Sequence, residues 1–335
     1  MRKYLASFML TALLPTGAWA DISLYGRAHL SLDYLDNGAD YSDISLSSNG
    51  SRLGFKADHQ LGEVKVFMQI EQEVDFDDGD AFTSKRNTFV GLQGSFGTFK
   101  VGHYDTPFKQ ARGPADFFGD ELGDLRNLTR VGNARFDERN DYTLGYSTPD
   151  LGNFQLHLAH SLGENSAGDE DVDDSMTSLA VTYDSDLLEA ALAYETYDKD
   201  HSRGERDGVR LALGYKLTSY LTLVGFAQSV EHEVEPGLDS EVLGIGADYA
   251  LTDKTQLRGH YFVRSADAEE SDSTMLTVGV VHKFDDHLSF YTNIASVSND
   301  DNIALRPYNQ TRNYDIAAVS GETTSGISLG AIYKF

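Results

Sequence analysis

The chain has 335 residues and a net charge of −26, from 27 Lys and Arg against 53 Asp and Glu. This acidic excess excludes binding to nucleic acid or to an anionic membrane surface through a general basic field. The absence of cysteine excludes a disulfide scaffold, and 18 Tyr, 18 Phe and 31 Gly with only 6 Pro exclude a disordered chain and favour an all-β fold.

The beginning of the chain has the pattern of a secretory signal peptide. Two basic residues follow the first methionine, a mostly apolar run comes next, and the small residues of "AWA" at 18–20 suit a signal peptidase. We therefore expect residues 1–20 to be removed, although a buried N-terminal helix is an alternative. The mature chain, 21–335, then has 25 basic and 53 acidic residues, a net charge of −28, and forms one domain.

Apolar and polar residues alternate in segments of about ten residues through the mature chain. In the first segment Ile22, Leu24 and Leu30 share one face, whereas Arg27 and His29 share the other. No later stretch approaches the roughly 20 consecutive apolar residues of a transmembrane helix, but segments of this length cross a bilayer as tilted strands. Comparable segments lie near 64–71, 139–146, 209–217 and 257–264. The count predicts about sixteen strands.

The connections between these segments also alternate in length. Short turns such as "LGE" at 61–63 alternate with long acidic stretches such as "GENSAGDEDVDD" at 163–174. Short turns at one end and long polar loops at the other are typical of an outer-membrane β-barrel. A soluble β-sandwich is the alternative, but many segments here carry charges on the polar face and aromatic residues near the ends of the apolar face.

The final segment, "GISLGAIYKF" at 326–335, is an apolar strand that would expose a free edge in an open sheet. In a closed barrel it pairs with the first strand, and no edge remains. We expect its apolar face to meet lipid, with Tyr333 and Phe335 in the interfacial aromatic girdle.

Four stretches resemble the general diffusion porins of Gram-negative outer membranes. They are "DISLYGRAHLSLDY" at 21–34, "SRLGFK" at 51–56, "RNTFVGLQGSFGTFKVGHYDTP" at 86–107 and the terminal "YKF". The resemblance implies a sixteen-stranded antiparallel barrel, a homotrimer and passive diffusion of small hydrophilic solutes. It also implies that the barrel-assembly machinery reads Phe335 as an assembly signal.

The segment from Thr106 to Glu138 is too long for an ordinary connection, and such segments are usually functional. The resemblance implies that it folds into the barrel and narrows it. Its core, 113–124, is similar to an acidic family element, with Ala115 inserted and Phe118 where a glycine is usual. The matching positions are Asp116, Phe117, Gly119 and Asp120. We expect Asp116 and Asp120 at the constriction by this match, and Glu121 and Asp124 by proximity.

Basic residues are expected on the facing wall. The resemblance assigns Arg52, Arg86 and Arg139 to it, while period-2 spacing adds Lys56 and Arg27. Acids on one side and bases on the other would create a transverse field across a water-filled gap. The alternative is that these charges are only a solvated wall.

The sequence thus predicts an outer-membrane porin with a mild cation preference, inferred from the charge of −28, and no enzymatic activity, cofactor or metal. Acidic loops could also bind lipopolysaccharide through divalent cations, although a solvated surface explains them as well. The alternatives are a substrate-selective porin, an outer-membrane enzyme such as a lipase or protease, and a secreted adhesin or lectin. No nucleophile–histidine cluster or phosphate-binding motif supports the enzyme.

Overall fold

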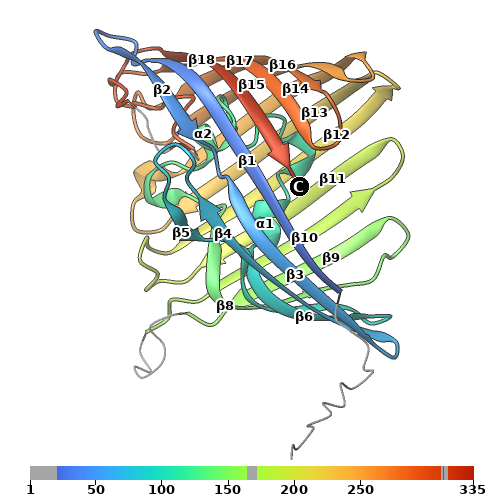
Figure 1. Cartoon of the computed structure of the whole chain (residues 1–335). Coiled ribbons are helices and arrows are strands. Elements are labelled where there is room, and N and C mark those ends of the chain that lie inside the picture. The colour runs from blue at the N-terminus through green and yellow to red at the C-terminus, as the bar shows by residue number, and fades with distance from the viewer. Residues whose placement is uncertain (1–20, 164–171, 311, 313–315) are drawn as a thin grey trace, which may run out of the picture.

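A computed structural model describes residues 21–163, 172–310, 312 and 316–335, so the predicted signal peptide lies outside the described residues. Its strands form one closed antiparallel sheet (Figure 1). The strands are β1 (Asp21–Asp36), β2 (Ser42–Ser48), β3 (Arg52–Leu61), β4 (Val64–Val74), β5 (Ala81–Lys85), β6 (Thr88–Gly94), β7 (Gly97–Asp105), β8 (Arg139–Ser147), β9 (Phe154–Ser161), β10 (Met176–Asp184), β11 (Leu188–Tyr197), β12 (Arg206–Thr218), β13 (Leu221–His232), β14 (Ser240–Thr252), β15 (Thr255–Ala266), β16 (Ser273–Lys283), β17 (Leu288–Asn299) and β18 (Thr324–Lys334).

The eighteen strand segments found in the described part of the chain occupy sixteen strand positions around the barrel, and each position is called a stave. β1 pairs with β2 along one half and with β3 along the other, so β2 and β3 are two parts of one stave. β5 and β6 divide another stave in the same way, because both pair with β4. The predicted sixteen-stranded antiparallel barrel is therefore confirmed.

The barrel closes where β1 meets β18. Ten residue pairs align between them, from Arg27 with Lys334 to Asp36 with Ser325. Beyond the pair of Arg27 with Lys334, the backbone groups of Gly26 and Phe335 exchange hydrogen bonds of 3.1 and 3.2 Å. The final strand thus has a partner on both sides, as predicted, which matters because lipid offers no hydrogen bonds to an open edge.

Alternate residues along each stave face lipid and the lumen. In β12, Val209 and Leu211 are 46% and 38% exposed on the outside, whereas Arg206 and Arg210 are fully buried on the inside. This polarity is the inverse of a soluble barrel, because the outer surface meets hydrocarbon and the inner one meets water.

The helices are short and belong to the connections. They are α1 (Pro107–Gln110), α2 (Arg126–Thr129) and the 3₁₀ turns Gly113–Ala115, Gly132–Ala134 and Pro236–Leu238. None of the helices in the described ranges is long and apolar enough to cross a membrane. The two longest connections, 106–138 and 300–323, both lie at the end of the barrel opposite the short turns.

Buried apolar clusters lie inside the barrel, where Figure 1 shows α1 and α2 within the ring of strands. One apolar cluster joins Phe108 and Phe136 of the segment 106–138 to Tyr197 of β11. A second joins Leu125 and Leu128 to wall residues on β12–β17. The segment therefore folds inward against the wall rather than outward into solvent.

Candidate functional site

The inward course of the segment 106–138 begins with a capped helical turn. Thr106 ends the extended chain, and its Oγ1 accepts a hydrogen bond of 3.2 Å from the Lys109 amide. Pro107 occupies the first turn, where its missing N–H costs nothing. Behind this turn the Phe108 ring packs against Phe136 in a tilted contact with 5.0 Å between centroids, so both limbs of the segment pack together.

Two buried charge contacts fasten the segment to the wall. Asp137 accepts hydrogen bonds of 2.6 and 3.0 Å from the Arg210 guanidinium of β12, and both side chains are fully buried. Farther along, Glu121 accepts hydrogen bonds of 2.7 Å from Arg258 of β15 and 2.7 Å from Asn293 of β17. These bidentate or charge-assisted bonds fix the position of the segment across the lumen.

The charges around Asp137 decide its protonation. Burial alone raises the pKa of this carboxyl, but the nearby positive charges of Arg210 and Arg112 outweigh burial and hold the pKa below its usual range. The contact between Asp137 and Arg210 is therefore an ion pair at neutral pH.

Described residues of a second connection, 300–323, contact the first. The Pro307 carbonyl accepts hydrogen bonds of 2.7 Å from the Gly123 amide and 2.9 Å from Asn127 Nδ2. Tyr308 is fully buried in an apolar cluster with Leu122. The inner segment is thus held by the wall and by a second loop.

A charged cavity of about 530 Å³ separates the segment 106–138 from the wall formed by β3–β8. Its basic lining residues are Arg52, Lys85, Arg86, Lys109, Arg112, Arg126, Arg130 and Arg139, and its acidic lining residues are Glu71, Asp105, Asp120, Asp137 and Glu138. Eight Lys and Arg against five acids give the lining a charge of +3, the opposite sign to the whole chain.

The three arginines predicted for the wall line this cavity together. Arg86 Nε lies 2.9 Å from Glu71, and its Nη1 lies 3.2 Å from Glu73. Arg139 Nε is 2.8 Å from Asp105. Arg52 is held more loosely, with its Nε 3.6 Å from Glu71. Carboxylates behind the guanidinium groups thus set their directions.

Of the four acids predicted for the constriction, only Asp120 lines the cavity. Its carboxylate bonds to Arg27 at 2.8 Å and to Arg126 at 2.7 Å. Burial raises the pKa of Asp120, yet Arg126 and Arg27 outweigh burial and hold the pKa well below its usual range. Asp120 is therefore the one predicted acid that faces the basic wall.

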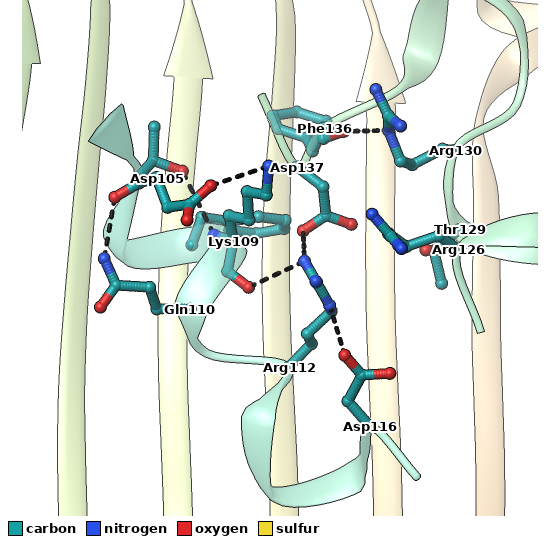
Figure 2. Close-up of polar contacts among 12 residues, drawn as sticks. Asp105, Lys109, Gln110, Arg112, Asp116, Arg126, Thr129, Arg130, Phe136 and Asp137 are labelled. Carbon is teal, nitrogen blue, oxygen red and sulfur yellow. Dashed lines mark hydrogen bonds and ion pairs between the residues drawn. The ribbon is translucent and has the colours of Figure 1, made fainter. Parts of the chain in front are cut away.

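The other three acids are engaged elsewhere. Asp116 pairs with Arg112 at 2.8 Å, as Figure 2 shows, and Asp124 pairs with Arg126 at 2.5 Å. Glu121 points to the opposite wall. The acidic face expected of the segment is therefore largely neutralised by arginines within the segment itself.

Two basic residues predicted for the wall are also absent from the lining. Arg27 is on the lumen side but forms an ion pair with Asp120. Lys56 is exposed, with its Nζ 4.6 Å from the centroid of the Tyr25 ring. Phe335 lies over Gly26, where any side chain at position 26 would collide with its ring.

Sequence reasoning missed the basic residues that the segment contributes. They are Lys109, Arg112, Arg126 and Arg130. In Figure 2, Arg112 lies between Asp116 and Asp137. A signal existed in the i,i+4 spacing of Asp105 with Lys109 and of Arg112 with Asp116, which brings such pairs together on a helical turn.

In the ranges that the structure describes, no group of three or more His, Asp or Glu is placed to hold a metal ion. What the cavity offers a solute is a dense set of fixed charges and hydrogen-bonding groups. A closed barrel with an apolar exterior and such a polar interior defines the class of transmembrane β-barrel proteins of outer membranes.

Within this class, the sequence matches the Gram-negative porin family over residues 6–302, and the chain belongs to that family. The family resemblance is therefore confirmed, and the protein is an outer-membrane porin of Gram-negative type.

Similar proteins agree with this assignment. The outer membrane porin protein 32 of Delftia acidovorans is 26% identical over 357 residues, covering 100% of this chain and 99% of the relative. The major outer membrane protein P.IB of Neisseria meningitidis serogroup A is 24% identical, covering 85% of this chain and all of the relative.

Solved structures share the fold. An anion-selective porin from Comamonas acidovorans has a TM-score of 0.81 at 22% identity, over 95% of this chain and 100% of that one. OmpT of Vibrio cholerae in its trimer form has a TM-score of 0.68 at 17% identity, over 94% and 99% of the two chains.

Proposed function

We propose that this porin is a passive diffusion channel for small hydrophilic solutes and ions, narrowed where the segment 106–138 faces β3–β8. The observation that carries the proposal is the cavity between them, whose walls are charged and held rigidly by ion pairs. Hydrated solutes pass such a gap without shedding all their water, whereas apolar solutes must disturb the water that the charges order.

The local charge favours anions. At about 0.1 M salt the screening length is about 10 Å, so acids on distant loops act weakly on an ion in the gap, while lining groups act strongly. The lining has eight basic and five acidic side chains. This argues against the mild cation preference predicted from total charge. The name of the Comamonas structure, an anion-selective porin, supports the same sign.

Within the gap, we assign Arg52, Arg86 and Arg139 to the basic wall and Asp120 to the facing acid. Their opposition supports a transverse field that orients polar solutes. The arginine excess, extended by Lys109 and Arg126 on the segment, sets the overall sign.

We further propose that residues 1–20 are a cleaved signal peptide, that the protein forms a homotrimer, and that Phe335 is read by the barrel-assembly machinery. The trimer form of OmpT supports the second point. Contact of the acidic outer loops with lipopolysaccharide through divalent cations remains a prediction from their composition.

The test is the reversal potential of purified protein in a planar bilayer under a KCl gradient. We expect stepwise openings and a potential of the sign set by chloride. Arg86→Gln should move the potential toward potassium. Lys283→Gln, an equal charge change on an exposed residue outside the lining, should move it far less.

Each element of the proposal can fail separately. A folded, inserted protein without conductance would overturn the diffusion channel. A potassium-selective wild type would overturn the anion preference. Equal shifts of the reversal potential for the two variants would show that Arg86 does not determine the selectivity of the gap.

A further inference from the structure

A second, smaller cavity lies in the lumen on the other side of α1. It has a volume of about 290 Å³ and is bounded by α1 and by strands β7–β10. Its polar side chains come from Lys100, Tyr104, Gln110, Tyr146, Ser147, Gln155, His157 and Thr182. Unlike the constriction, it has no acidic residue in its lining, so it carries one fixed positive charge.

That charge, Lys100, makes no ion pair within 4 Å with any residue that the structure describes, and Asp105 attracts it only from a longer distance. None of the ion pairs found among the described residues includes it, and its Nζ instead lies 4.6 Å from the Tyr104 ring centroid and 5.4 Å from that of Phe89. Aromatic faces hold an ammonium group in place without neutralising it. The ammonium N–H groups are therefore available to an anion that enters the cavity.

A second donor stands in the same lining. The Tyr104 hydroxyl is buried and makes no hydrogen bond in the described structure. It lies against Gly145, where any Cβ would collide with it, so a glycine is required for this placement. An unpaired buried hydroxyl is costly, and a ligand oxygen that accepts a hydrogen bond from it would remove that cost.

The remaining lining is neutral. His157 is held in place by hydrogen bonds with Ser147 Oγ at 2.9 Å and Thr182 Oγ1 at 3.1 Å. Gln155 donates its amide to the Thr148 carbonyl at 2.8 Å, which leaves its oxygen as an acceptor. Apolar surface from residues such as Pro107 completes the cavity.

We propose that this cavity is a binding subsite for a small organic monocarboxylate that also carries a neutral hydrogen-bonding group. The carboxylate would bond to Lys100 and the Tyr104 hydroxyl, and the neutral group would meet Gln155. A dianion would leave one charge uncompensated beside a single lysine, and an amino acid zwitterion would find no acid for its ammonium group. The subsite rests on the proposed diffusion function only for the route by which its ligand arrives.

The test is a ligand-observed NMR titration of the purified porin in detergent, with N-acetylglycinate as the probe. Its uncharged analogue N-acetylglycinamide has nearly the same shape. We expect the carboxylate to bind at least about tenfold more tightly than the amide, because a charge-assisted hydrogen bond is lost in the amide.

Variants assign the site. Lys100→Gln should weaken carboxylate binding about tenfold or more, Lys100→Arg should retain most of it, and Tyr104→Phe should weaken it by a smaller factor. Lys65→Gln is the matched control, because Lys65 also stands over an aromatic ring, with its Nζ 5.9 Å from the Phe67 centroid, but lies outside this cavity. The control should bind like wild type.

Equal binding of the two probes, or equal binding by wild type and Lys100→Gln, would overturn the subsite. If Lys100→Gln does not fold, the Tyr104→Phe result decides, since wild-type affinity in that variant would also contradict the proposal. The titration needs no ion current. A protein that conducts ions but does not bind the carboxylate would contradict only the subsite. A protein that binds the carboxylate but does not conduct would contradict only the channel.

Discussion

Replacing Asp137 by asparagine is expected to release one limb of the segment 106–138 from the wall. Asparagine keeps the shape of Asp137 but removes the charge that faces Arg210, and both side chains are fully buried. A buried arginine left without its partner costs about 3–5 kcal/mol. Since about 1.4 kcal/mol is a factor of ten, the detached state should become roughly two to three and a half orders of magnitude more populated.

Hydrogen exchange followed by mass spectrometry measures this population. Amides of α1, whose Phe108 carbonyl also accepts a hydrogen bond from Arg210, should lose protection in Asp137→Asn by about that factor. Amides of α2, which keeps its contact with Pro307, and amides of β12 and β13 should change far less. Glu138→Gln is the neighbouring control. Glu138 is 19% exposed and pairs with Arg130, Arg135 and Arg203, which water reaches in part, so its loss should cost less than the loss of a fully buried pair. If both variants exchange alike, the buried ion pair does not hold the segment.

Three further results are expected. Burial lowers the pKa of Lys109 to about 8 against the opposing effect of Asp105, so raising the pH from 7 to 9 removes a lining charge and should weaken the anion preference. Lys109→Arg should abolish this pH dependence, and a variant that keeps it would show that another group titrates. Asp120→Asn changes the lining from +3 to +4 and should shift the reversal potential further toward chloride, whereas a shift toward potassium would contradict the charge argument. Gly26→Ala should reduce the yield of heat-resistant barrel refolded in detergent, because the added methyl group meets the Phe335 ring. Adding Phe335→Ala to this variant should restore the yield, whereas normal refolding of Gly26→Ala alone would contradict the steric argument.

The barrel could be predicted because lipid and water impose opposite polarities on alternate residues. Arg210 and Leu211 are neighbours in sequence, yet one is buried inside and the other faces hydrocarbon, and that contrast is visible in the sequence alone. The breaks between β2 and β3 and between β5 and β6 leave no such trace, because they change pairing rather than polarity.

The charge pattern of the site was harder to predict. Net charge counts every acid equally, whereas the gap responds to those within a screening length. The partners of Glu121, Arg258 and Asn293, are more than 130 positions away, so no local pattern reveals that this acid faces the far wall. The contact of Pro307 and Tyr308 with the inner segment was also missed, although the lack of alternation around Pro307 distinguishes this part of the chain from a strand.

The seam between β1 and β18 has a consequence for the order of assembly. Every other pair of neighbouring staves is consecutive in the chain, so each can pair before the rest of the chain is present. The seam joins Arg27 to Lys334, so its ten residue pairs form only when nearly the entire chain is present. Until that step, two unpaired edges are open to other chains, and pairing of those edges between molecules competes with closure. The rate of this one ring-closing event therefore sets how long a newly exported porin is vulnerable to aggregation.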